Sequence, residues 1–116
     1  AAPANALRLL LNLCLVGAIV PFAWPVRVAL EASAMPRASA VARWQAPRRD
    51  FVVNLRHDSV VFDDPVRRRL LPLVDGTRTR DALALELAAI APDAAAPRRR
   101  VDEHLAHFAR IGVLEA

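Results

Sequence analysis

The stretch Asn54–Asp64, NLRHDSVVFDD, concentrates residue types that can perform acid–base chemistry. It offers an amide, a guanidinium, an imidazole and several carboxylates around a short apolar core. A general base or nucleophile would also need a pocket, a partner group and oxyanion donors, and the neighbouring sequence supplies no such loop. We therefore interpret the stretch as a polar corner that holds a small domain together. Asn54→Ala should then cost about 1 to 2 kcal/mol, because backbone groups lose their partners.

Within this corner, Asn54 and His57 are residue types that tolerate positive φ and bond to nearby backbone. Arg56 is expected to form an ion pair with one of three carboxylates, Asp58, Asp63 or Asp75. All of these roles are structural. The sequence therefore predicts no catalytic residue here.

His104 and His107 lie one turn apart on a predicted helix, with Arg100 a further turn back. Such a pair can in principle hold a metal ion, but a metal site needs a third ligand. Cys14 lies in an apolar run, and Glu103 points away from the histidines. We interpret this histidine face as solvated and expect no metal.

Arginines mark two further surfaces. The last predicted helix carries four, Arg98, Arg99, Arg100 and Arg110. Acidic residues are interleaved with them, the helix lacks Asn, Gln and Lys for reading bases, and the wing that follows is not basic, all of which disfavours DNA binding. The triplet Arg67–Arg69 is interpreted as a solvated helix face, with docking on an acidic partner as the alternative.

The chain contains only three glycines, and none belongs to a glycine-rich phosphate loop. An acidic-glycine loop of the kind that opens S-adenosylmethionine sites is also missing. The sequence therefore predicts no cofactor-binding residue within this chain.

Start and stop signals define the expected elements. Strands are predicted at 19–22, 51–53 and 59–62, and helices at 5–16, 26–34 and 39–46. Another helix should begin at the Asp64 cap and Pro65 and end at Asp75-Gly76. The next should begin at the Thr79 cap and end before Pro92, and the last should begin at Pro97.

From the strand at 59–62 onward, three helices follow, and the apolar residues after Gly112 form the last strand. The order strand, helix, helix, helix, strand is the outline of a winged helix. The expected fold class is mainly α with short β-strands (α+β). The pattern from Leu105 to Leu114, helix then glycine then apolar strand, also repeats that from Leu10 to Ile19. Several prolines lie in the segment that follows the stretch from Leu10 to Ile19, and we interpret that segment as a linker.

Composition limits the class of protein. The 116 residues are 55% hydrophobic and 24% charged, enough to bury a core, and the net charge of +4 is spread along the chain. One cysteine, Cys14, excludes an internal disulfide. Asn12, Gly17 and Pro21 interrupt the leading apolar run, which argues against a signal peptide and a membrane span. A cytoplasmic location is expected, and the absence of an initial Met suggests a piece of a longer protein.

Three motifs in order carry a resemblance: Arg43-Trp44-Gln45-Ala46, Asn54-Leu55-Arg56-His57 and Asp75-Gly76-Thr77-Arg78. From Pro36 to Ala116 the chain resembles the C-terminal part of bacterial methyltransferases that carry a methyltransferase regulatory domain. This group includes protein-lysine methyltransferases. The signature positions, interpreted as structural, are Arg43, Trp44, Asn54, Arg56, His57, Asp75 and Gly76.

The resemblance implies a division of the chain. Residues 1–35 would be the tail of the preceding regulatory region with a linker, and residues 36–116 a winged-helix-like domain. The parent protein would bind S-adenosylmethionine elsewhere, and this chain would serve substrate docking or interdomain contact. Its expected partners are the rest of the parent and a protein substrate, with neither DNA nor a membrane.

The helix pair around Asp75-Gly76 also resembles, more weakly, the peptide-binding domains of the coenzyme PQQ chaperone type. These domains bind a leader peptide along a strand edge. A peptide-binding module is therefore an alternative function, and a winged-helix DNA-binding regulator is a further one.

Overall fold

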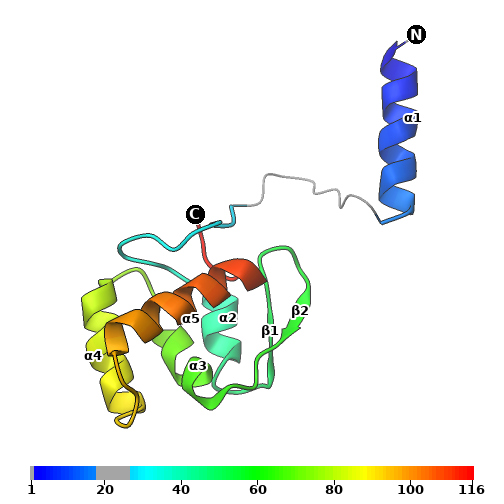
Figure 1. Ribbon diagram of the computed structural model, residues 1–116. Coiled ribbons are helices and arrows are strands. Elements are labelled where there is room, and N and C mark those ends of the chain that lie inside the picture. Colours follow the sequence, from blue (N-terminus) through cyan, green and yellow to red (C-terminus); the bar gives the residue numbers. More distant parts are fainter. Residues whose placement is uncertain (1, 18–26) are drawn as a thin grey trace.

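The helices and strands follow the predicted order. The computed structural model describes residues 2–17 and 27–116. Helix α1 stands apart from a domain that contains all the other elements (Figure 1). The elements are α1 (Ala2–Leu15), α2 (Ala40–Gln45), β1 (Phe51–Val53), β2 (Ser59–Val61), α3 (Pro65–Leu70), the 3₁₀ helix η1 (Leu71–Leu73), α4 (Arg80–Ile90) and α5 (Pro97–Ile111).

Short polar side chains start three of the helices. Ser39, Asp64 and Thr79 cap α2, α3 and α4, and each accepts hydrogen bonds from first-turn backbone N–H groups at 2.9–3.2 Å. These bonds satisfy donors that have no partner within the helix. At the other end of the domain, Gly112 adopts φ +80 and terminates α5. The caps predicted at Asp64 and Thr79 are thus confirmed.

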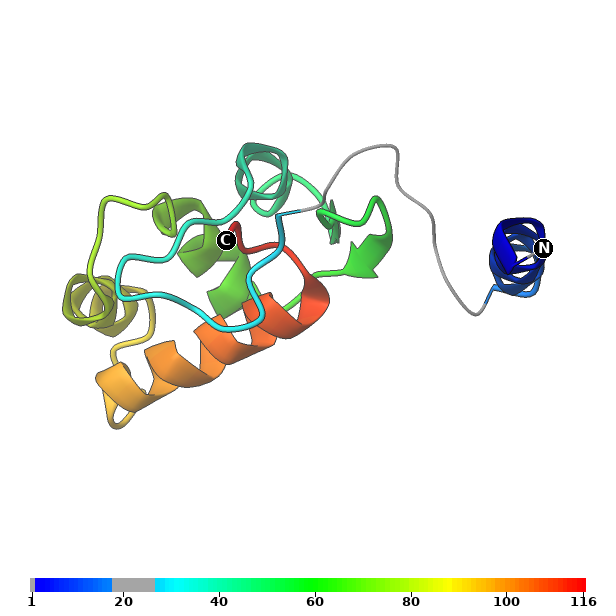
Figure 2. The same cartoon turned by 90° about the horizontal axis from the view of Figure 1, so that it is seen from above.

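The core lies between α5, which runs along one side of the domain, and the other elements (Figure 2). Helix α4 crosses α5 at a steep angle near the start of α5 and packs against it (Figure 2). Phe108 of α5 contacts Phe62, with ring centroids 5.8 Å apart. The predicted stripes of the two helices are largely buried: Leu83, Leu87, Val101, Leu105 and Phe108 are all inaccessible to solvent.

The antiparallel hairpin of β1 and β2 is the only regular sheet among the described residues, with Val52 opposite Val60. A second, irregular ladder forms around the C-terminal segment. Val113 accepts a hydrogen bond from Ser39 N at 2.9 Å, and Leu114 accepts one from Ala29 N at 2.9 Å. The predicted wing strand is thus reduced to isolated bridges at Leu114 and Glu115, and Val113 and Leu114 are buried.

The helix predicted at 26–34 is wrong over its described part, residues 27–34. This segment is extended, and Val28 forms an isolated antiparallel bridge with Glu115. Its backbone groups bond to the C-terminal segment, while Ala29 and Ala32 pack against the core. Tertiary pairing has replaced the local helix preference, which is weak compared with packing.

The single helix predicted from Pro65 to Asp75 is also corrected. The α-helix ends at Leu70 and continues as η1, because Pro72 has no N–H to donate and its ring would clash with a preceding carbonyl. The predicted stop at Asp75-Gly76 is therefore too late, although Gly76 does adopt the left-handed conformation expected of it, with φ +85. The break turns the chain so that Asp75 can form a bridge with Arg37.

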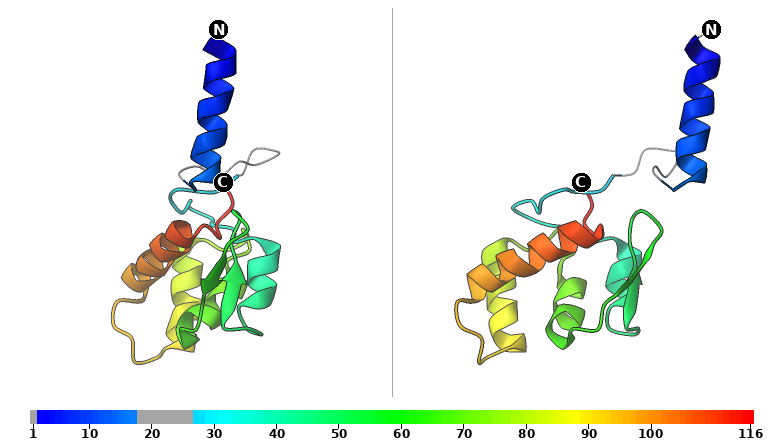
Figure 3. Two further views of the ribbon diagram at one scale, coloured as in Figure 1. Left: turned by 90° about the vertical axis from the view of Figure 1, so that its right-hand side faces the viewer. Right: turned by 45° about the vertical axis from the view of Figure 1, so that its right-hand side comes forward.

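Helix α1 confirms the helix predicted at 5–16. It stands clear of the domain in every view (Figure 3). Its large apolar side chains are exposed, with Leu7 at 69% and Leu15 at 75%. The strand predicted at Ile19–Phe22 lies outside the described residues. No helix in the described ranges is both long and apolar enough to cross a membrane.

Because α1 buries so little surface, removing residues 1–17 should leave the domain's unfolding unchanged. Thermal denaturation followed by circular dichroism, with the 116-residue chain as reference, tests this. The expected result is the same melting temperature and a smaller helical signal. A clearly lower melting temperature would show that α1 packs on the domain.

Candidate functional site: the signature residues and the face of α5

Asn54 joins the β1–β2 loop to the end of α5. Its Oδ1 accepts hydrogen bonds from the backbone N–H groups of Arg56 and Asp58, both at 2.9 Å, and its Nδ2 donates to the carbonyl of Ile111 at 3.0 Å. The residue is buried, with 9% of its surface exposed. Every hydrogen bond of this amide therefore stays inside the fold, as a structural role requires.

The loop around Asn54 closes tightly. His57 adopts φ +65, in the left-handed region that was expected of it, and its N–H donates to the carbonyl of Asn54 at 3.0 Å. Leu55 N donates to the carbonyl of Gly112 at 2.9 Å. Among the described residues no ion pair joins Arg56 to the three carboxylates proposed for it, and Arg56 instead lies against Gly112.

The Asp75-Gly76-Thr77-Arg78 motif forms a second joint. Asp75 accepts hydrogen bonds from Thr77 N at 3.0 Å and Thr77 Oγ1 at 2.6 Å, and it pairs with Arg78 at 3.0 Å. The hydrogen bonds from Thr77 are the main cause that lowers the pKa of Asp75. Gly76 N donates to Pro36 O, and a Cβ at Gly76 would meet Arg37 at 3.3 Å.

The Arg43-Trp44-Gln45-Ala46 motif forms a third joint on α2. Arg43 Nε donates to Ala38 O at 3.1 Å, and Gln45 Oε1 accepts from Val53 N at 2.8 Å. Trp44 differs, because 53% of its surface is exposed and the Arg48 guanidinium lies 4.7 Å from the centre of its ring. Of these side chains, only that of Trp44 remains largely available to a partner.

The arginines at the start of α5 take part in a network of ion pairs. Arg98 pairs with Asp81 at 2.9 Å and with Asp102 at 2.7 Å, and Arg80 of α4 pairs with Asp102 at 2.9 Å. Arg99 reaches Glu103 at 3.4 Å. The charges of Arg98 and Arg99 are thus compensated within the domain, whereas Arg100 has no ion pair among the described residues.

His104 is not on a solvated face, so that interpretation is corrected. It is 8% exposed, stacks on Phe108, and its Nδ1 accepts a hydrogen bond from Arg67 Nε at 3.2 Å. Burial first, and then the charge of Arg67, lower the pKa of His104. The triplet arginine Arg67 therefore points inward to hold the α3–α5 contact, which the sequence spacing could not reveal. His107 is only partly buried.

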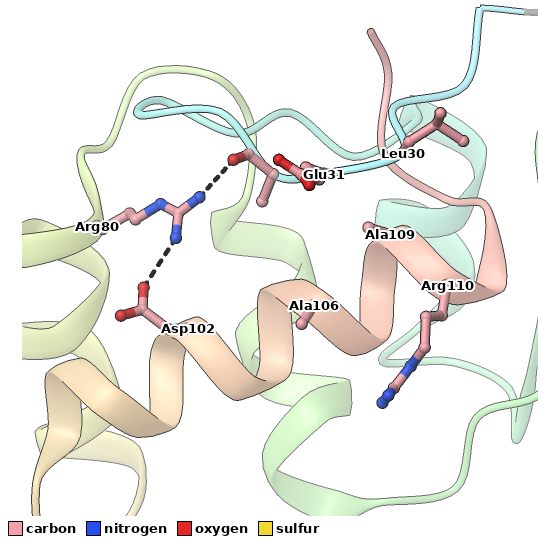
Figure 4. Close-up of a pocket in the computed structure, with 8 residues that line it drawn as sticks. Leu30, Glu31, Arg80, Asp102, Ala106, Ala109 and Arg110 are labelled. Atoms are coloured by element: carbon pink, nitrogen blue, oxygen red, sulfur yellow. Dashed lines mark hydrogen bonds and ion pairs between the residues drawn. The ribbon is translucent and has the colours of Figure 1, made fainter.

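A cavity of about 360 Å³ lies between α5 and the extended segment that crosses it (Figure 4). Arg80 stands at one end of this cavity, where it donates to the carbonyls of Ala32 and Ser33 and pairs with Asp102. Ala106 and Ala109 contribute its α5 side. Sequence reasoning missed Arg80, since the carbonyls that it holds are almost fifty residues away in the chain.

Several groups that could contact a nucleoside cofactor already have partners within the fold. Asp64 caps α3, Asp75 holds its own turn, and Asp102 pairs with two arginines. The backbone of Gly112 faces Asn54 and Arg56, and that of Gly76 faces Arg37. No group of three or more potential metal ligands gathers in the described ranges.

Taken together, these contacts define a mainly α domain with a short hairpin. Its polar motifs form hydrogen bonds that connect separate segments of the chain. Residues 34–108 match the family described as the C-terminal winged helix domain of PKMT, and the chain belongs to that family. The winged-helix fold class and the recognised group are thereby confirmed.

Solved structures agree with this fold. The chain is similar to PKMT2 from Rickettsia typhi, with a TM-score of 0.70 and 17% identity over 96% of this chain and 26% of that one. PKMT2 in complex with AdoHcy gives the same score and identity over 90% and 25%. The chain thus spans about a quarter of the proteins that it matches. No curated protein matches it.

Asn54→Ala should lower the free energy of unfolding by about 2 kcal/mol, because the carbonyl of Ile111 and the backbone N–H groups of Arg56 and Asp58 lose their partners. Asn54→Asp is the matched variant: it keeps the acceptor for the loop but puts a carboxylate oxygen opposite the Ile111 carbonyl, which repels it. It should therefore also be less stable than wild type. Urea denaturation measures all three, and an Ala variant as stable as wild type would contradict the structural role.

Acid should destabilise the domain through His104. Because its folded-state pKa lies below the unfolded value of about 6.5, stability is full above about pH 6.5 and falls as the pH drops toward the folded pKa. His104→Gln can still accept from Arg67 but does not titrate. Urea denaturation between about pH 7 and pH 5 should show a weaker pH dependence in this variant, with His107 contributing the remainder. An unchanged slope would contradict the role of His104.

Proposed function

We propose that this chain is a non-catalytic accessory domain of a protein-lysine methyltransferase that uses S-adenosylmethionine. It would place the parent's other domains and a protein substrate relative to one another. The observation that carries the proposal is its membership of the PKMT C-terminal winged helix family, together with polar motifs whose described contacts serve the fold. The parent's activity, its cytoplasmic location and its bacterial origin belong to the same proposal.

The exposed face of α1 supports an interdomain role. Leu7, Leu11 and Leu15 follow one another every four residues on one side of the helix, and each is at least 59% exposed. An exposed apolar face of this kind marks an interaction site. The solved relative is about four times as long as the matched region. We propose that α1 belongs to the preceding region of the parent, with the predicted boundary near residue 35, and that it packs there.

The surroundings of α5 argue against the DNA-binding alternative. In helix-turn-helix proteins the recognition helix must enter the major groove. Here the segment around Glu31 and Ala32 crosses α5, held by Arg80, and the arginines Arg98 and Arg99 are in ion pairs. Arg100 and Arg110 keep their charge without an ion pair in the described ranges, but the segment that crosses α5 covers part of the surface that would have to enter a groove.

The peptide-binding alternative has one observation in its favour. The outer edge of β1 is closed where Val53 N donates to Gln45, but β2 pairs with no third strand in the described part of the chain. Val61 of β2 is 73% exposed. An extended peptide could add to this edge by backbone pairing. The strand is only three residues long, which limits the affinity available to such a peptide.

The proposal predicts that S-adenosylmethionine and AdoHcy leave the melting temperature of the 116-residue chain unchanged, since a ligand that binds only the folded state must raise it. Differential scanning fluorimetry measures this. A lysozyme-like protein without such a site serves as the negative control for the reagents. A concentration-dependent rise would mean that the chain contains a cofactor site and would contradict the proposal.

A further inference from the structure

Arg48, Arg49, Arg68 and Arg69 follow Pro47 or lie on the outer side of α3, and they have no carboxylate partner among the described residues. Arg37, Arg78, Arg80, Arg98 and Arg99 are in ion pairs. Arg100 and Arg110 of α5 also lack a carboxylate partner in the described part of the chain, but only Arg68 and Arg69 line a mostly apolar groove. Arg48 lies over Trp44, Arg49 over Phe51, and Arg68 donates to the carbonyls of Ala46 and Pro47. This side of the domain therefore carries positive charge that the chain does not compensate.

The same side holds an open groove of about 530 Å³, lined by Pro47, Pro65, Arg68, Arg69 and Pro72. Its lining is mostly apolar. Each proline ring is locked in φ and has no N–H, so the groove is rigid and offers no backbone donors from these residues. Its volume suits one or two apolar side chains of a peptide.

We propose that this groove binds an acidic segment of a partner protein that carries an apolar anchor residue. The prolines would receive the anchor, and Arg69 would pair with a carboxylate beside it. Arg68 is already fixed by its two carbonyl bonds, so its charge is held in place before binding and little freedom is lost. The inference rests on the proposed accessory role and names the chemistry of one partner for it.

Nucleic acid suits the groove less well. The three prolines provide no backbone N–H for phosphates, and the groove contains no aromatic ring on which a base could stack. Trp44, the nearest exposed ring in the sequence, is covered on one side by Arg48. The apolar lining has no role with a phosphate chain, whereas it fits an aliphatic side chain.

Fluorescence anisotropy with the 116-residue chain tests the proposal. The probe is a labelled synthetic peptide of about ten residues in which glutamates surround one leucine. Three comparison probes replace the leucine by glycine, replace the glutamates by lysines, or use single-stranded DNA of the same length. The acidic leucine peptide should bind tightest, and each replacement in the peptide should weaken binding about tenfold or more.

Two charge-matched variants locate the site. Arg69→Gln should weaken binding of the acidic leucine peptide about tenfold, through loss of a charge-assisted contact. Arg99→Gln removes the same charge from the exposed start of α5, where it pairs with Glu103, and should leave binding unchanged. Both positions are exposed, so neither variant should impair folding, and equal melting temperatures confirm this.

Several outcomes would contradict the proposal that the groove binds an acidic segment. These are absence of binding up to about 1 mM, equal weakening by both arginine variants, equal affinity for the lysine peptide, and tighter binding of the DNA. Loss of binding in Val61→Pro but not in Arg69→Gln would place the peptide on the β2 edge instead. None of these results affects the melting-temperature test with S-adenosylmethionine and AdoHcy. The proposed accessory role therefore stands or fails independently of peptide binding in the groove.

Discussion

The turn at Gly112 is the constraint on which the rest of the domain depends. Just before it, the carbonyl of Ile111 accepts from Asn54, and at the turn itself the carbonyl of Gly112 accepts from Leu55. The positive φ of Gly112 then sends Val113 and the following residue into the interior, where both are fully or almost fully buried. One residue thus fixes the hairpin loop, the end of α5 and the C-terminal ladder, because a side chain in left-handed conformation would be strained there.

Polar side chains in this domain act mainly on the backbone. The amides of Asn54 and Gln45 accept hydrogen bonds from backbone N–H groups of the hairpin that have no backbone partner among the described residues. The Arg80 guanidinium donates to carbonyls of the segment that crosses α5. Buried backbone groups must find partners, and a small domain with only two short strands cannot supply them all from regular structure. The motifs that could suggest catalysis are therefore explained by this need.

Some arginines bind elements of the domain together, and others keep a charge that no carboxylate of the described residues compensates. Around α4 and α5, Arg80 and Arg98 share Asp102 and bind the elements together. Beside α2 and α3, the Arg48 guanidinium lies over Trp44, and Arg68 and Arg69 line a groove with three prolines. The partner that we propose would supply negative charge at that groove. Recognition would then lie away from α5, the helix that corresponds to the DNA-reading helix of other winged helices.

Much of this protein was determined by its sequence alone. Short polar caps, proline at helix starts, glycine at helix ends and the apolar stripes of α4 and α5 act over one or two turns, so local reasoning located these elements. The order of the elements and the quoted motifs then indicated the winged-helix class and its family. The structural role of Asn54 followed from the lack of any catalytic partner nearby.

Only the tertiary structure decided which side chains meet across long separations. The segment at 27–34 favours a helix locally, but the C-terminal ladder and Arg80 hold it extended, since pairing and burial outweigh helix propensity. His104 looked solvated beside arginines, yet Arg67 and Phe108 enclose it. Spacing along a chain gives the face of a helix but not what covers that face, because contacts between distant segments depend on how the whole chain packs.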